Sequence, residues 1–276
     1  MPVADITNRA LIRVNGAEAE HFLHNLVTCD IEGLKAGALS AGALLTPQGK
    51  ILFDFLVSRE GDGFLLDCRA DIAAEFARRL KFYRLRAKAD IEVQEQALVA
   101  VFWQIDSSAG LRDTRFGEEA PVSRAYGMTS DGAETHYTRL RIENGVAEGG
   151  FDYAFSDVFP HDVNLDQSGG VSFAKGCYVG QEVVSRMQHR GTARRRVLIA
   201  AGEAALEGGA PVTAGGRAIG TLGSALQKNA LALVRIDKVK DAMEAGIDIL
   251  AGGIPLTLSL PPRATFSWPE TSGGDE

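Results

Sequence analysis

Residues 175–182 read KGCYVGQE and place one cysteine, Cys177, between two glycines and ahead of a glutamine and a glutamate. The residues that follow carry an apolar stripe at helical spacing, so a helix is predicted to begin beside the cysteine. Gly176 and Gly180 allow a tight turn there. The positive end of the helix dipole and the ammonium of Lys175 both favour the thiolate form of Cys177. The stretch therefore predicts a working thiol, with a small, inert, buried cysteine as the alternative.

Before this stretch, strand and helix patterns alternate along the chain. Predicted strands cover 11–14, 51–58, 64–68 and 91–103. One predicted helix covers 18–27. A second is predicted to begin at Asp71 as its cap, because the apolar residues Ile72, Phe76 and Leu80 recur every four positions. Strands mixed with separate helices are typical of an α+β domain.

Beyond Gly191 the pattern changes to short strands separated by turns rich in glycine and proline. Strands are expected at 197–201, 218–223 and 231–236, with one short helix in the stretch DKVKDAMEAG at 237–246. Such a pattern favours a small antiparallel barrel or sandwich. We therefore predict an α+β domain at 1–192, a β-barrel domain at 193–266 and a disordered tail at 267–276.

The composition excludes several classes of protein. The chain has 276 residues, a net charge of -7 and 45% hydrophobic residues, which argues against a surface built throughout to grip nucleic acid. No stretch reaches the ~18 apolar residues of a membrane span, so no membrane partner is expected. The three cysteines lack metal-ligand spacing with each other or with the nearby His161 and His189, so neither a disulfide set nor a metal site is predicted. A reduced, cytoplasmic protein is the expectation.

Asp54 is unusual within its predicted strand. In ILFDFLV, residues 51–57, alternation puts Asp54 on the same face as Leu52 and Leu56. A carboxylate between leucines is costly unless a partner compensates its charge. The residue is therefore either the partner of a nearby arginine or a carboxylate aimed into a ligand pocket.

Two basic clusters contain no acidic residue. The first, RRLKFYRLRAK at 78–88, includes Tyr83 and Arg84, and the second is RMQHRGTARRR at 186–196. Their segregation on an acidic chain suggests binding of an anion such as a phosphate, a polycarboxylate or RNA, although a charge run is commonly only a solvated face. Glu143, in RLRIENG, lies on a predicted half-solvated strand whose periodicity assigns it no special role.

With these residues assembled, the sequence resembles the YgfZ branch of the aminomethyltransferase-like (GcvT-related) folate-binding family. KGCYVGQE resembles the signature of that branch, and supporting matches are TPQGKILFDFLV, RLKFYRLRAKADI, RLRIENG, FPHDVNLD and, in the barrel, GGRAIGTLGSA. One departure is Asp162, where the resemblance predicts a glutamate. The shorter side chain puts a direct ligand contact from that position in doubt.

The resemblance implies a tetrahydrofolate-binding domain with a central opening, followed by a β-barrel. It implies Cys177 and Asp54 as catalytic candidates, and it implies that Asp54 and Glu143 bind the folate. The further candidates for binding the cofactor are Tyr83, Arg84, Lys175 and Gln181. A pterin offers adjacent N–H donors that a carboxylate can accept, and a basic cluster suits the anionic glutamyl tail.

The implied role is support of iron–sulfur enzyme maturation or repair, linked to tRNA modification, with iron–sulfur client enzymes as partners. One alternative is an aminomethyltransferase that moves a one-carbon unit to tetrahydrofolate. That reaction needs an acid near the folate nitrogens but no cysteine, so the Cys177 signature argues against it. A second alternative is an RNA-binding module that uses the cluster at 186–196, with an affinity that falls steeply with salt. Whether any catalytic turnover takes place is left open by the sequence.

Overall fold

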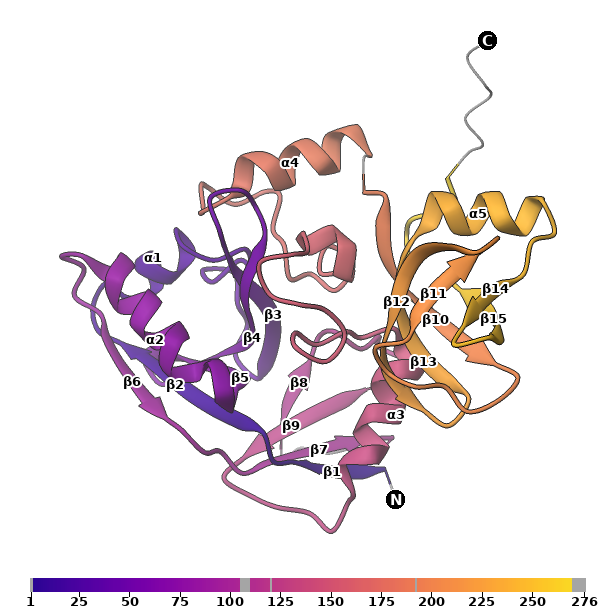
Figure 1. Ribbon diagram of the computed structural model, residues 1–276. Helices are drawn as coiled ribbons and strands as arrows, with labels where there is room; N and C mark the ends of the chain where they lie inside the picture. Colours follow the sequence, from indigo (N-terminus) through magenta and orange to yellow (C-terminus); the bar gives the residue numbers. More distant parts are fainter. Residues whose placement is uncertain (1, 105–109, 120, 192, 270–276) are drawn as a thin grey trace.

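The computed structural model describes residues 2–104, 110–119, 121–191 and 193–269, which form a mixed α/β part followed by a β-barrel (Figure 1). The elements of the first part are β1 (Val3–Ile6), β2 (Arg9–Asn15), α1 (Ala19–His24), β3 (Ala38–Leu45), β4 (Ile51–Glu60), β5 (Gly63–Arg69), α2 (Ala70–Arg84), β6 (Asp90–Gln94), β7 (Val99–Trp103), β8 (Leu111–Asp113), β9 (Val122–Tyr126), α3 (Glu134–Asn144), the 3-10 turn η1 (Pro160–Val163) and α4 (Gln181–Arg190). The elements of the second part are β10 (Arg195–Gly202), β11 (Pro211–Ala214), β12 (Arg217–Leu226), β13 (Asn229–Arg235), α5 (Ile236–Glu244), β14 (Ile249–Ala251) and β15 (Ile254–Ser259).

Nine strands of the first part form one sheet in the order β1-β7-β9-β8-β3-β4-β5-β2-β6. All of its pairings are antiparallel except the one that joins its two halves, where Ala38 and Leu39 of β3 pair in parallel with Arg112 and Asp113 of β8. The β4–β5 hairpin turns at Gly61, whose φ of 56° suits glycine. This arrangement places β4, and with it Asp54, near the middle of the sheet.

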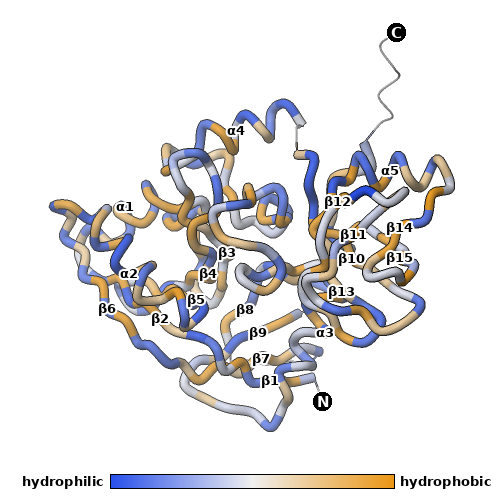
Figure 2. Tube along the Cα trace, in the orientation of Figure 1, coloured by the Kyte–Doolittle hydropathy of each residue, from blue (hydrophilic) through white to orange (hydrophobic). Residues whose placement is uncertain are grey.

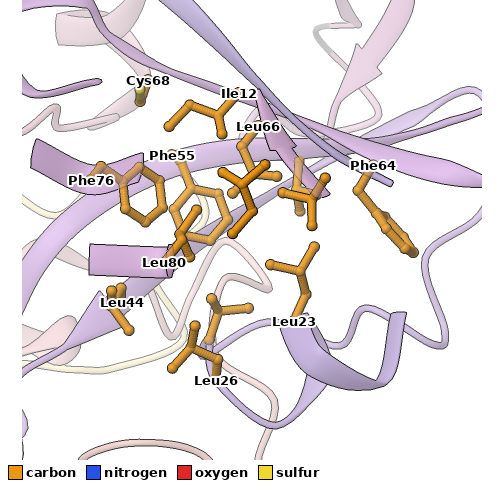
Figure 3. Close-up of a cluster of buried hydrophobic side chains, with 14 of the residues drawn as sticks. Ile12, Leu23, Leu26, Leu44, Phe55, Phe64, Leu66, Cys68, Phe76 and Leu80 are labelled. Atoms are coloured by element: carbon orange, nitrogen blue, oxygen red, sulfur yellow. The ribbon is translucent and has the colours of Figure 1, made fainter. Parts of the chain in front are cut away.

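The main core of the first part lies between the β2–β5 face of the sheet and helices α1 and α2 (Figure 3). The ring of Phe76, on α2, stacks on the rings of Phe53 and Phe55, with centroids 4.9 and 5.3 Å apart. The helix predicted from the apolar residues 72, 76 and 80 is confirmed, but Asp71 does not cap it. Arg69 occupies the N-cap position without a side-chain hydrogen bond, and Asp71 instead pairs with Arg69.

The second part is a closed antiparallel barrel in the strand order β10-β13-β12-β11-β14-β15, which confirms the predicted barrel. The short helix predicted in the stretch 237–246 is α5, which covers one end of the barrel (Figure 1). Figure 2 shows apolar stretches in the barrel strands, and the buried side chains of these strands form one core cluster, as expected for a small barrel filled by side chains. Of the predicted tail, Trp268 packs against the barrel core, and residues 270–276 lie outside the described residues.

Helix α4 lies between the two parts at the top of Figure 1. Of its ten residues only Val184 is buried, and its outer side is polar (Figure 2). Among the described helices, none is long and apolar enough to cross a membrane.

Candidate functional site

Asp54 lines a pocket that both parts of the chain enclose. Its Oδ2 atom accepts hydrogen bonds from the Gly149 backbone N–H at 2.8 Å and from the Tyr153 hydroxyl at 2.7 Å. Within the described part of the chain, Oδ1 of Asp54 has no hydrogen-bond donor. The half-buried carboxylate is therefore held in place by one oxygen and leaves the other for a ligand.

Four segments that are distant in the sequence build most of the walls of this pocket. They are the β3–β4 region, residues 144–149 from the end of α3, residues 163–168 from the end of η1, and residues 261–266 after the last barrel strand. The last segment is fastened across the pocket, because Arg263 donates to the carbonyls of Thr114 and Arg115 at 2.7 and 2.9 Å. The site thus combines both parts of the chain.

One wall of the pocket belongs to a buried network of charged side chains. Its members are the four arginines Arg9, Arg115, Arg124 and Arg141, the four carboxylates Asp67, Asp113, Glu148 and Asp152, and the hydroxyls of Tyr126 and Tyr137. The positive and negative charges are equal in number, which limits the cost of burying them. Arg9, Arg115 and Glu148 also face the pocket.

Glu148 is the carboxylate of this network that reaches the pocket. Its Oε1 accepts from Arg115 at 3.2 Å and from the Tyr137 hydroxyl at 2.8 Å. Burial by itself would raise the pKa of Glu148, but Arg141, Arg115, Arg9 and Arg124 together hold it well below its ordinary range. Glu148 is therefore an ionised acceptor beside the pocket.

The depressed pKa of Glu148 makes its contribution to stability depend on pH. A carboxylate whose pKa is lower in the folded state stabilises the fold above its unfolded pKa of ~4.3, and this contribution is lost as the pH falls from about 5 toward the folded pKa. We expect urea unfolding of the wild type to show a steep loss of stability between about pH 5 and pH 3, and a shallower slope for Glu148→Gln. Equal slopes for the two proteins would contradict the assignment.

Glu143 does not line the pocket. It lies near the end of helix α3 with its side chain exposed, so the predicted strand at RLRIENG is wrong. The helix buries Tyr137, Leu140 and Arg141, which follow helical rather than alternate spacing. The carboxylate that faces the pocket is Glu148, four residues beyond the end of α3 and not identified from the sequence.

The other predicted cofactor ligands also lie outside the pocket lining. Tyr83 and Arg84 are half-buried on the last turn of α2, where the tyrosine packs against the main core and the arginine donates to the Ala89 carbonyl at 3.2 Å. Gln181 is the first residue of α4. Of the residues proposed to bind folate, the structure brings only Asp54 to the pocket.

Lys175 does not line the pocket that contains Asp54, and its ammonium contacts backbone instead. The Nζ atom donates to the backbone carbonyls of His24, Val27 and Cys29, the last two at 2.7 and 2.8 Å. These carbonyls belong to the end of α1 and the turn after it. The lysine is therefore held by backbone acceptors, and none of these three hydrogen bonds goes to the Cys177 thiol, whose thiolate form the ammonium was predicted to favour.

Cys177 is exposed in the loop before α4, whereas Cys29 and Cys68 are buried. Burial raises the pKa of each buried thiol to about 12, which makes both unreactive at neutral pH. Of the three cysteines, Cys177 alone is placed to meet a partner. In the part of the chain that the structure describes, no group of three His, Cys, Asp or Glu side chains is arranged to hold a metal ion.

Two of the five arginines of the second basic cluster form ion pairs with the first part of the chain, whereas Arg186, Arg190 and Arg194 are exposed. Arg195 pairs with Asp157 and Asp162, and the buried Arg196 pairs with Asp166 at 2.7 Å. Asp162 also accepts the backbone N–H of Phe159, at 3.0 Å. Asp162, which stands where the resemblance predicts a glutamate, therefore holds the local backbone and the side chain of Arg195 in place.

Comparison with known proteins identifies relatives over most of the chain. It is 32% identical over 217 residues to the iron–sulfur cluster assembly factor IBA57 homolog, mitochondrial, of Pyricularia oryzae, covering 70% of this chain and 55% of the relative. It is 28% identical to the mouse IBA57, covering 85% of this chain and 78% of the relative. It is 27% identical to the tRNA-modifying protein YgfZ of Aliivibrio fischeri MJ11, covering 72% and 71% of the two chains. This chain thus spans little more than half the length of the fungal relative.

The fold also has a solved counterpart. The glycine cleavage system aminomethyltransferase T from Bartonella henselae superposes with a TM-score of 0.70 at 17% identity, over 94% of this chain and 85% of that protein. At this identity the likeness establishes the fold alone. Residues 194–266 match the model of the CAF17 C-terminal beta-barrel domain.

Proposed function

We propose that this chain, which is similar to YgfZ and IBA57 proteins over most of its length, supports the maturation or repair of iron–sulfur enzymes and binds a reduced folate. In this proposal the folate occupies the pocket beside Asp54, and Cys177 is the working thiol. The clients are iron–sulfur enzymes, including enzymes that modify tRNA. The three free cysteines support a reducing compartment such as the cytoplasm.

The free oxygen of Asp54 is the observation that carries the folate proposal. A reduced pterin presents ring N–H groups and an amino group, which are donors that match a carboxylate acceptor. Glu148 supplies a second ionised carboxylate at the same pocket. Arg263 also lines it; its hydrogen bonds go to backbone carbonyls, so its positive charge can serve an anionic tail. The residues present therefore fit a folate.

The chemistry that a bound folate supplies is the carriage of a one-carbon unit. Tyr153 and the Gly149 N–H orient Asp54 so that its free oxygen can hold a donor on the ligand. The pKa of Tyr153 is raised well above its ordinary value by burial and by Asp54, so the tyrosine remains a hydrogen-bond donor at neutral pH. These groups bind and orient the ligand.

An aminomethyltransferase is the second candidate, favoured by the fold and by the position of Asp54. It would need no exposed thiol. Turnover of tetrahydrofolate with an aminomethyl-loaded carrier protein, unaffected by Cys177→Ala, would favour this function over the first. The RNA-binding alternative has less support, because Arg195 and Arg196 are engaged in ion pairs within the protein.

Asp54→Asn is expected to weaken tetrahydrofolate binding by roughly tenfold to a hundredfold, because a charge-assisted hydrogen bond contributes about 1.5–3 kcal/mol. Isothermal titration calorimetry of the wild type and the variant measures the difference. Glu143→Gln is the matched control, because it removes an exposed carboxylate outside the pocket, and it should bind like the wild type. Absence of binding by the wild type, or equal affinity of Asp54→Asn, would reject the folate site.

A further inference from the structure

The loop that carries Cys177 is fastened to helix α1 by Lys175. Three backbone carbonyls, those of His24, Val27 and Cys29, surround the lysine Nζ, which donates a hydrogen bond to each. A lysine ammonium has three donors, so this arrangement uses all of them. The lysine therefore ties residue 175 to a segment about 150 positions earlier in the chain.

The three carbonyls are a suitable partner for a cation. His24 is the last residue of α1, where a backbone carbonyl has no acceptor role within the helix and carries the negative end of its dipole, and Val27 and Cys29 follow in the turn beyond it. Burial lowers the pKa of Lys175, while Cys29, Asp30 and Glu32 oppose that shift. The Nζ also lies 5.3 Å from the centre of the Tyr178 ring, which is itself buried. Lys175 and Tyr178, which flank Cys177 in the sequence, are thus both packed against the rest of the protein.

A second attachment lies on the other side of the cysteine. Gly180, the N-cap of α4, has a φ of 79°, and a Cβ there would come within 2.6 Å of the Thr46 carbonyl oxygen and 3.0 Å of the Gly49 Cα. The turn at 46–49 and the start of α4 therefore touch backbone to backbone. Only glycine permits this approach at Gly180.

Between these two attachments, Gly176 and Cys177 are exposed and Tyr178 is buried. A third contact lies before Lys175, at the start of the loop, where the Ser172 N–H donates to the Thr28 carbonyl at 2.9 Å. The loop is anchored at both ends and open to solvent at the thiol.

We propose that Lys175 is a positioning residue that holds the Cys177 thiol at a fixed place on the surface, through the carbonyls at and after the end of α1 and not through contact with a ligand or with the thiol. Its importance for activity rests on the proposed function, in which Cys177 is the working thiol. The position of the loop itself does not depend on that function.

The test uses Lys175→Met, which keeps a long side chain and removes the three donors. Hydrogen exchange of the backbone amides at 173–180 should become at least about tenfold faster, as expected when charge-assisted hydrogen bonds that hold a local segment are lost. A nitroxide attached to Cys177 should become more mobile in its electron paramagnetic resonance spectrum. The native protein suits this labelling, because Cys29 and Cys68 are buried.

Lys228→Met is the control, because Lys228 is an exposed lysine on the barrel and should change neither reading. Gly180→Ala tests the second attachment without touching the ammonium, and it should also mobilise the label. If Lys175→Met does not fold, Lys175→Gln, whose shorter side chain has two N–H donors in place of three, takes its place. An unchanged label in the Lys175 variant that folds, or exchange that accelerates equally throughout the protein, would overturn the proposal. These readings need neither folate nor client, so they stand even if Cys177→Ala retains cellular function and the proposed function fails.

Discussion

Arg124→Met is expected to lower the free energy of unfolding by about 3–5 kcal/mol, because it removes one partner from buried ion pairs. The Arg124 side chain is 0% exposed and pairs with Asp67 at 2.9 Å and with Asp113 at 3.4 Å. Methionine fills a similar length of space and leaves both carboxylates with one cation fewer. Urea unfolding at neutral pH measures the difference.

The matched control for this prediction is Arg13→Met. Arg13 pairs with Glu60 at 2.8 Å, but its side chain is 37% exposed and that of Glu60 is 41% exposed. An exposed pair of this kind contributes ~0–1 kcal/mol. If both variants lost the same small amount, the buried network would not be a determinant of stability.

The hairpin and the barrel could be predicted from the sequence because their signals are local. Residues 51–58 and 64–68 form β4 and β5 around a turn that contains Gly61, as the two runs of strand-forming residues and the turn between them indicate. The barrel strands follow the same rule between turns rich in glycine and proline. In each case the residues that determine the element lie within it.

The error at Glu143 shows where local reading fails. RLRIENG alternates for only a few residues, and such a short pattern fits a strand and one face of a helix equally well. In the structure Arg141 is buried and pairs with Asp152, so a charged residue occupies an interior position of α3. Its partner lies beyond the helix, and the local sequence does not reveal that pairing.

Long-range pairing also explains why the sequence indicates Asp54 as a candidate pocket residue but does not indicate Glu148. Asp54 interrupts an apolar strand, which is a visible local signal. Glu148 lies in a loop, GVAEGG, where an acidic residue is unremarkable. Its role depends on Arg115 and Arg141, which approach it only in the folded chain.

Cys177→Ala is expected to abolish support of iron–sulfur enzymes in cells while leaving the fold and folate binding intact. The side chain is exposed, so its truncation should change the free energy of unfolding by no more than about 0.5 kcal/mol. Cys177 does not line the pocket that contains Asp54. The loss should therefore appear in the activity of an iron–sulfur enzyme in a strain that depends on this protein, at an unchanged protein level and melting temperature.

Two further variants separate thiol chemistry from surface shape at this position. Cys177→Ser keeps the size of the side chain and replaces a nucleophilic, metal-binding sulfur with a weakly acidic hydroxyl, so it should fail as completely as alanine. Phe173→Ala truncates an exposed neighbour in the same loop and should retain most of the activity. Full activity of Cys177→Ala would show that the thiol does no chemistry. Loss of activity with Phe173→Ala but not with Cys177→Ser would show that the loop acts by its shape, and the fixed position that Lys175 provides would then serve recognition and not reaction.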